Sequence, residues 1–100
     1  MTIRWSRRAV RDLAQIHLYI EADDPEAADR WVRKLWERAE QASRMPMAGR
    51  VVPEYGRADL REVFVKRYRI IYRVEGRDFV VVTVVEGHQL LPRGVDPDED

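Results

Sequence analysis

Closely spaced basic residues give the clearest chemical signal in this sequence. In the segment YRIIYRV, Arg69 and Arg73 alternate with apolar residues, and Lys66 and Arg67 come immediately before it. Successive side chains of a strand point to opposite faces, so Arg69 and Arg73 share one face. Arg61, on the preceding strand-like run, can lie across from them. Because a guanidinium pairs with phosphate or carboxylate through two parallel hydrogen bonds, this face could hold an anionic partner.

A simpler interpretation of the same arginines stays open. They would lie on the solvated face of an ordinary sheet, paired with nearby carboxylates. The acidic residues within reach are Glu54, Glu62, Glu75 and Glu86. The sequence alone does not separate these two interpretations.

Two histidines are the remaining candidates for proton transfer. His88 follows the last strand-like run in VVEGHQLLP, where it could approach the arginines. An imidazole with its ordinary pKa near 6.5 can act as general acid or base, although a plain loop histidine fits as well. His17 flanks an apolar helical stripe and is interpreted as structural. We find no cysteine, phosphate-binding glycine loop, zinc motif or Ser/His/Asp signature, so no metal or cofactor is expected.

Length and charge indicate one small domain with a distinct tail. The chain has 100 residues, and we expect a single domain over residues 1–92. Residues 93–100 include GVDPDED, an acidic segment expected to lack fixed structure or to become ordered against a partner. Without its four acids, eighteen basic residues face fourteen acidic ones, about +4 in total. Sixteen of the eighteen are arginine, which either anion binding or a GC-rich genome explains.

Targeting signals are not recognisable in the sequence. The start MTIRWSRRAVRD lacks the apolar region of a secretory signal. No apolar run approaches the roughly 20 residues that cross a bilayer. We therefore expect a cytoplasmic protein without a membrane partner.

The elements that must position these residues begin with a short strand and two helices. TIRW reads as a strand, and Ser6 as the N-cap of a helix from Arg7 to about residues 21–23. Asp24 and Pro25 begin a second helix, and the short connection predicts an antiparallel helical hairpin. Trp36 lies beside its apolar stripe, at the core edge or facing a partner.

The second half of the chain predicts strands. Prolines and glycines between residues 44 and 59 indicate a surface loop. LREVFV, YRIIYRV and FVVVTVV are rich in β-branched and aromatic residues, with a hairpin turn at EGRD. The order is β-α-α-β-β-β. We expect an α+β fold with the helical hairpin packed on a small, mostly antiparallel sheet.

The whole pattern resembles the RelE/ParE superfamily of type II toxin–antitoxin toxins. The matching features are RWSRRAVRDLAQIHLYI, DDPEAADRWVRKL, PMAGRVVPEYGRADLREVFVKRYRIIYRV and the ending VVEGHQLLP, which span about residues 2–92. The resemblance implies the fold just described. It also implies a cognate antitoxin that neutralises the toxin, with an acidic, amphipathic segment suited to the basic surface.

Two activities occur in this superfamily. RelE-like members cut mRNA on the ribosome without metal, and for them the resemblance implies a catalytic set of Arg61, Arg69 and His88. This chain lacks the C-terminal tyrosine of several such nucleases, and its acidic tail would repel RNA. ParE-like members poison DNA gyrase and cut no RNA. The long helical hairpin and the ending GHQLLP look more like ParE.

We therefore expect a ParE-like growth inhibitor, with a RelE-like endoribonuclease as the alternative. Under the ParE-like interpretation the basic residues bind the target or the antitoxin. That set is Arg61, Lys66, Arg67, Arg69 and Arg73.

Overall fold

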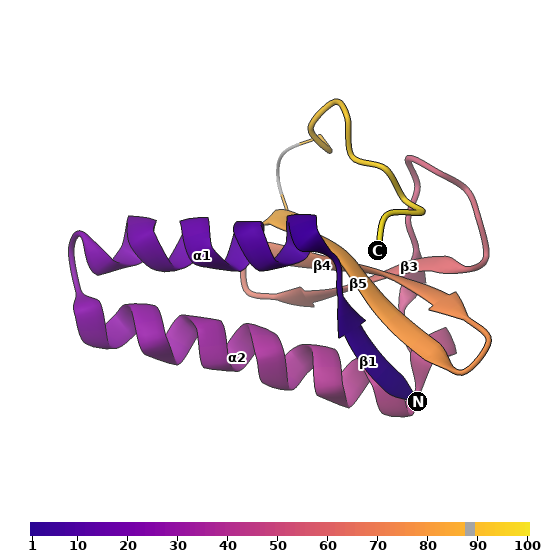
Figure 1. The fold of residues 1–100 in the computed structure, drawn as a ribbon, viewed down its shortest axis with the longest axis horizontal. Helices are drawn as coiled ribbons and strands as arrows, with labels where there is room; N and C mark the ends of the chain where they lie inside the picture. The colour runs from indigo at the N-terminus through magenta and orange to yellow at the C-terminus, as the bar shows by residue number, and fades with distance from the viewer. Residues whose placement is uncertain (88–89) are drawn as a thin grey trace.

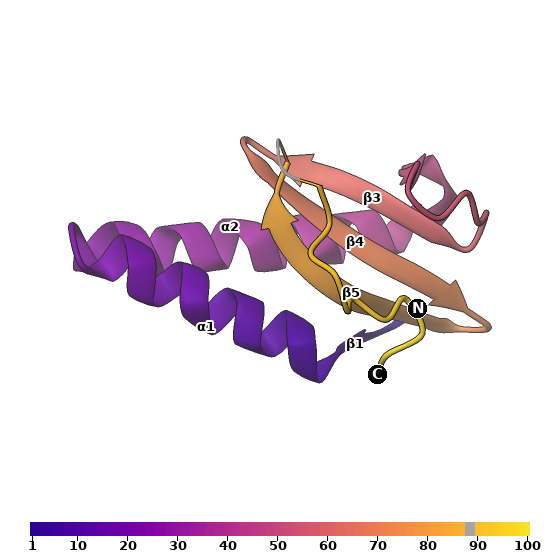
Figure 2. The same cartoon turned by 90° about the horizontal axis from the view of Figure 1, so that it is seen from above.

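A computed structural model describes residues 1–87 and 90–100 of the chain. Two long helices lie on one face of a five-stranded sheet. The end of the helical hairpin where α1 connects to α2 projects beyond the sheet (Figures 1 and 2). The elements are β1 (Thr2–Trp5), α1 (Arg7–Glu21), α2 (Pro25–Arg44), the 3-10 helix η1 (Pro46–Ala48), β2 (Arg50–Val51), β3 (Leu60–Val65), β4 (Tyr68–Glu75) and β5 (Asp78–Glu86).

The predicted α+β architecture is confirmed. The strand order is β1-β5-β4-β3-β2, antiparallel throughout except that β1 runs parallel to β5. Parallel strands need a long connection to bring the chain back to the same end of the sheet. Here the helical hairpin and three strands, which lie between β1 and β5 in the chain, provide that connection. One detail differs from the prediction. Residues 44–59 were expected to form a surface loop, but part of this segment forms η1 and the two-residue strand β2.

Local caps explain where the helices begin and end. The Ser6 hydroxyl accepts a hydrogen bond from the amide of Ala9 at 3.0 Å and donates one to the Val82 carbonyl at 2.7 Å. Asp24 accepts from the amide of Ala27 at 3.1 Å and begins α2 as predicted. α2 stops at Arg44, because the next residue precedes Pro46 and the helical backbone is disfavoured there.

Two apolar clusters lie on opposite faces of the sheet. Beneath the helices, Leu35 and Ala39 of α2 pack on Tyr68, Ile70 and Tyr72 of β4. Alternation puts these three β4 residues on the face opposite Arg69 and Arg73, and that is the face that the helices cover. The second cluster consists of Val52, Leu60, Ile71 and Val82, with Tyr55, Leu91 and Val95 packed against it.

The second cluster shows that the sheet is covered on both faces. Its outer layer comes from the loop after β2 and from the C-terminal segment, which crosses this face (Figure 2). Arg69 and Arg73 stand on this face of β4, between the loop and the tail. That covering decides what these arginines can contact.

Candidate protein-binding site

Arg69 and Arg73 are buried, which differs from the open basic surface expected for them. Each residue is only 4% exposed. Their guanidinium groups pair with carboxylates of the same chain, three of which were named above as the alternative partners: Glu54, Glu62 and Glu75. The face is neither free for a polyanion nor solvated.

Arg69 lies at the centre of a buried ion-pair network. It donates to Glu62 Oε1 through Nε at 2.9 Å and Nη2 at 2.6 Å. Its two terminal nitrogens reach both oxygens of Glu54 at 3.0 Å, in a bidentate pair. These hydrogen bonds hold the pKa of the Glu54 carboxyl below its ordinary value, and the Glu54 contact raises the pKa of Arg69. Because a buried charge needs such partners, this network is structural.

Arg73 fastens the tail to the sheet. Its guanidinium donates to Glu75 Oε2 at 3.0 Å and to Asp100 Oδ1 at 2.7 Å. It also donates to the carbonyls of Pro97 at 2.8 Å and Glu99 at 3.1 Å. All of these acceptors belong to the same chain, so an external anion would have to displace one of them.

Strand register separates Arg61 from the other two arginines. On β3, Arg61 lies opposite Tyr72, and Glu62 lies opposite Ile71. Directly opposed residues of an antiparallel pair share a face, so Arg61 belongs to the Tyr72 face and Glu62 to the Arg69 face. The structure therefore brings a carboxylate to Arg69 where the sequence suggested a third arginine.

Arg61 binds backbone carbonyls of the preceding loop. It donates to the carbonyls of Ala58 and Gly49 at 3.0 Å each and of Met47 at 3.1 Å. Nearby, the Tyr72 hydroxyl donates to the carbonyl of Pro46 at 2.5 Å. Arg61 thus holds η1 and β2 against the sheet.

Lys66 and Arg67 are the exposed members of the predicted basic set. They form the turn between β3 and β4, where Lys66 adopts a positive φ of 52°. The guanidinium of Arg67 lies 5.6 Å from the ring centroid of Tyr68, a cation–π geometry. These two side chains remain accessible to an acidic partner.

The histidines differ in what the structure says about them. His88, the proposed acid–base residue, lies outside the described residues. His17 joins the two helices: its Nε2 lies 2.8 Å from Asp29 Oδ1, and its Nδ1 lies 3.7 Å from Glu21 Oε2. This placement gives His17 the structural role predicted for it.

Two kinds of feature are absent from residues 1–87 and 90–100. No group of three or more His, Asp or Glu side chains there is arranged to hold a metal ion. No helix in the same residues combines the length and apolar character required to span a bilayer.

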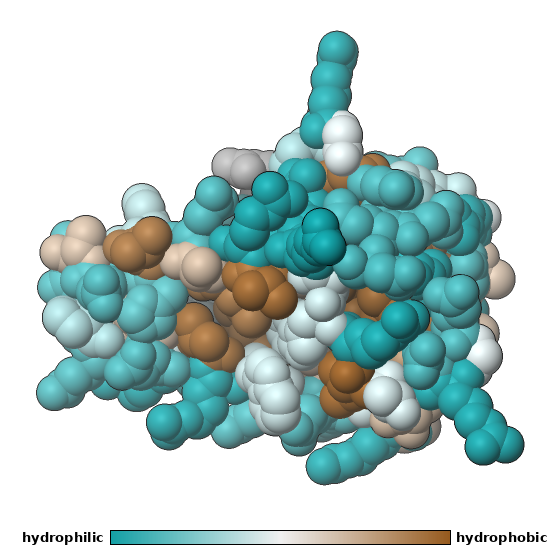
Figure 3. Space-filling view, viewed as in Figure 1, coloured by the Kyte–Doolittle hydropathy of each residue, from teal (hydrophilic) through white to brown (hydrophobic). Residues whose placement is uncertain are grey.

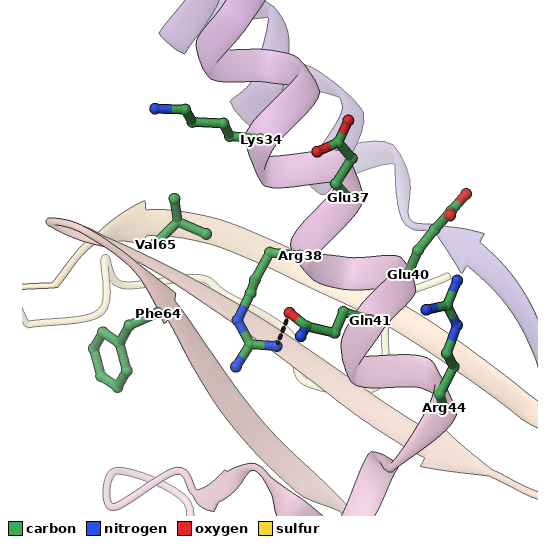
Figure 4. A pocket seen from close by; sticks show the side chains of 8 residues that line it. All are labelled: Lys34, Glu37, Arg38, Glu40, Gln41, Arg44, Phe64 and Val65. Carbon is green, nitrogen blue, oxygen red and sulfur yellow. Dashed lines mark hydrogen bonds between the residues drawn. The ribbon is translucent and has the colours of Figure 1, made fainter.

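A groove between α2 and β3 was not anticipated from the sequence. It has a volume of about 510 Å³ and lies beside the outer edge of β3 (Figure 4). β2 pairs only with Arg61 and Glu62, so Val63–Val65 have no partner strand on that edge among the described residues. Phe64 and Val65 form the sheet side of the groove. Its helix side is formed by Lys34, Glu37, Arg38, Glu40, Gln41 and Arg44.

The helical arm, meaning α1, α2 and the connection between them, carries exposed apolar side chains. Leu18 is 64% and Tyr19 72% exposed. Trp36 of α2 is 47% exposed, so it faces solvent more than the core-edge interpretation implied. Apolar patches are visible over this part of the molecule in Figure 3. Leu18 and Tyr19 are adjacent in the chain, and an exposed apolar patch on a monomer is a candidate protein-binding surface.

One sequence signal could have revealed the exposed apolar side chains of the helical arm. Leu18, Tyr19 and Trp36 stand off the regular apolar stripes of their helices, so the core cannot account for them. The groove left no comparable signal, because it results from the shortness of β2 and from the crossing of α2 over β3.

Comparison with known proteins agrees with this architecture. Residues 3–91 match the family described as "ParE toxin of type II toxin-antitoxin system, parDE". The chain is 38% identical over 94 residues to "Putative toxin Y4kP" of Sinorhizobium fredii, covering 91% of this chain and 93% of the relative. A solved structure titled "Chromosomal ParDE TA system from P. aeruginosa" superposes with a TM-score of 0.74 at 20% identity, covering 86% of this chain and 95% of that one.

The family match spans nearly all of the sheet and both helices, and the structural match supports the same fold. The ParE-like branch favoured by the helical hairpin is thereby confirmed. This chain belongs to the ParE toxin family of type II toxin–antitoxin systems.

Proposed function

We propose that this chain inhibits growth by binding DNA gyrase in the cytoplasm and that it does not cut RNA. The observation that carries the proposal is the burial of Arg69 between two carboxylates. RNA cleavage by 2′-OH attack needs groups that move protons and cations that stabilise the developing charge. Arg69 is already neutralised by Glu54 and Glu62, and Arg61 faces the other side of the sheet.

The helical arm supports a protein target. Leu18, Tyr19 and Trp36 provide apolar and aromatic area, and aromatic residues are enriched among those that dominate protein–protein binding energy. We assign this surface to the target. The α2–β3 groove is then left for a second partner.

That second partner is a cognate antitoxin with an acidic, amphipathic segment. The free edge of Val63–Val65 offers backbone groups to an added strand, and Phe64 offers an apolar contact. Lys34 of the groove and the exposed turn residues Lys66 and Arg67 supply positive charge for an acidic segment.

The deciding experiment assays two activities of the same preparation. The full chain, expressed in an inducible strain and purified, is tested for inhibition of gyrase supercoiling and for cleavage of mRNA on translating ribosomes. We expect inhibited supercoiling with intact message. Cleaved message with normal supercoiling would instead establish the RelE-like alternative, and harmless expression with neither effect would contradict both.

Antitoxin binding has a matched pair of variants. Lys34→Glu places a negative charge in the groove, where it would repel an acidic segment. Arg33→Glu makes the same change of charge at an exposed neighbouring residue outside the groove. We expect K34E, but not R33E, to weaken co-purification with the product of the adjacent antitoxin reading frame. Equal binding by both variants would remove the groove from the proposal.

A further inference from the structure

We propose that residues 95–100 form an acidic strap that occupies a binding site for extended acidic peptides, and that such a peptide binds by displacing the strap. The site lies on the sheet face opposite the helices, away from the α2–β3 groove. This inference does not depend on gyrase or on the antitoxin. It follows from how the tail is seated.

The apolar part of the site accepts one side chain of the strap. Val95 packs against the cluster formed by Val52, Leu60, Ile71 and Val82. The Tyr55 hydroxyl donates to the Val95 carbonyl at 3.3 Å, which sets the position of the backbone there. The strap is thus anchored where it enters the site.

Two arginines receive the charged part of the strap. Arg57 donates to both oxygens of Asp98, through Nη2 at 2.9 Å and Nη1 at 3.2 Å. Arg73 donates to Asp100 at 2.7 Å and to two strap carbonyls. Side-chain and backbone groups of the strap are both bound, as expected for a site that recognises an extended peptide.

The beginning of α1 completes the site. The Arg8 amide donates to Glu99 Oε2 at 2.9 Å, and Arg4 lies 3.4 Å from Asp100 Oδ1. A carboxylate beside the first turn of a helix is stabilised by the unpaired amides there. Glu99 therefore binds the first turn of α1, while Asp98 and Asp100 bind Arg57 and Arg73.

Two acidic side chains of the strap are exposed, whereas Arg73 beneath them is buried and Arg57 is 38% exposed. The side chains of Asp98 and Asp100 are 62% and 65% exposed, but that of Arg73 is 5% exposed. Exposed ion pairs contribute little individually and are screened by salt. The strap is also not part of any strand. It can therefore leave while the cationic site stays in place, and a peptide of similar chemistry can enter.

The test uses the strap sequence itself as the probe. A fluorescein-labelled peptide RGVDPDED is titrated into the full-length parent and into the full-length variant D98N/E99Q/D100N. The control D23N/E26Q/E37Q makes the same charge change at exposed positions outside the strap. A tethered strap competes at an effective concentration in the millimolar range, so we expect about tenfold or more tighter binding by the strap variant alone.

A second measurement reports on the strap directly. The exchange rate of the Arg8 amide proton, followed by nuclear magnetic resonance, should be slow in the parent at low salt. It should rise in D98N/E99Q/D100N and in Arg57→Gln, and in the parent as added salt shortens the Debye length from about 10 Å at 0.1 M to about 3 Å at 1 M. Arg57→Gln should also weaken peptide binding, because Arg57 belongs to the site.

Three outcomes would overturn the inference. The first is equal peptide affinity for the parent, the strap variant and the control. The second is an Arg8 amide that exchanges equally fast in the parent and the strap variant at low salt. The third is a concentration-dependent dimer of the parent, which would mean that the site takes the tail of a second copy.

Discussion

Glu62 and Arg69 form a closed ion pair inside a chain of only 100 residues. The Glu62 side chain is 0% exposed, and one of its oxygens accepts two hydrogen bonds from the Arg69 guanidinium, at 2.6 and 2.9 Å. Glu62 also accepts from Arg50 Nε at 2.6 Å, which links β2 to β3 and β4. Within the basic segment, Arg69 is therefore part of the internal scaffold, whereas Lys66 and Arg67 are exposed.

Removing the charge of Glu62 should destabilise the domain strongly. Glu62→Gln leaves Arg69 buried with one carboxylate fewer, and breaking a buried pair of this kind costs about 3 kcal/mol. Urea denaturation followed by far-UV circular dichroism measures the change. Glu37→Gln, at an exposed position of α2, serves as the control and should stay within about 0.5 kcal/mol of the parent. A similarly small effect for E62Q would show that the pair is dispensable.

Stability should fall in acid, and Glu54 should contribute to that fall. Its pKa is held below the ordinary 4.5, first by the hydrogen bond from Arg69. A carboxyl with a lowered folded-state pKa stabilises above its unfolded pKa, and this stability is lost as pH falls through the folded value. The free energy of unfolding of Glu54→Gln, measured from pH 7 downward, should therefore depend less on pH below about 4.5 than that of the parent. Parallel curves would exclude this contribution.

Gly49 should tolerate no side chain, because a β-carbon there would overlap the Tyr72 hydroxyl. Gly49→Ala is expected to lower stability by about 1–3 kcal/mol, the usual range for overpacking. The same change in a Tyr72→Phe background should cost less, since the obstructing oxygen is gone. Thermal unfolding of the four proteins gives the coupling energy. A coupling energy of zero would mean that the added methyl group does not collide with the Tyr72 hydroxyl.

Ser6 should be worth more than an ordinary N-cap. Ser6→Ala removes the acceptor for the Ala9 amide and also leaves the buried Val82 carbonyl without its hydroxyl donor. We expect a loss of about 2 kcal/mol in urea denaturation, at the upper end for N-cap substitutions. Ser6→Thr, which keeps the hydroxyl, should recover part of it. If Ser6→Thr lost as much stability as Ser6→Ala, the hydroxyl hydrogen bonds would not account for the effect.

The helical arm should matter for toxicity and little for folding. Leu18→Ala/Tyr19→Ala removes exposed side chains, so the melting temperature should change by only a few degrees. Growth inhibition and gyrase inhibition should both fall about tenfold or more if the arm contacts the target. Met47→Ala, an exposed change on η1, controls for loss of apolar surface. Full activity of the double variant would assign the target contact to another surface.

Local sequence patterns determined the secondary structure of this protein. β1, β3 and the starts of both helices lie where strand composition and N-cap residues predict them. Alternation also assigned Tyr68, Ile70 and Tyr72 to the helix-covered face of β4. These features depend on neighbouring residues, whose spacing is readable in the chain.

The environment of the arginines was decided by the tertiary structure. Alternation places Arg69 and Arg73 on one face, but it does not say what covers that face. The register of β3 against β4 brings Glu62, rather than Arg61, to Arg69, and the returning tail brings Asp100 to Arg73. The first contact depends on the strand register of a hairpin and the second joins residues 27 apart in the chain, so the sequence alone left open whether this face binds anions or is already filled. The packing of loop and tail over the sheet fills it.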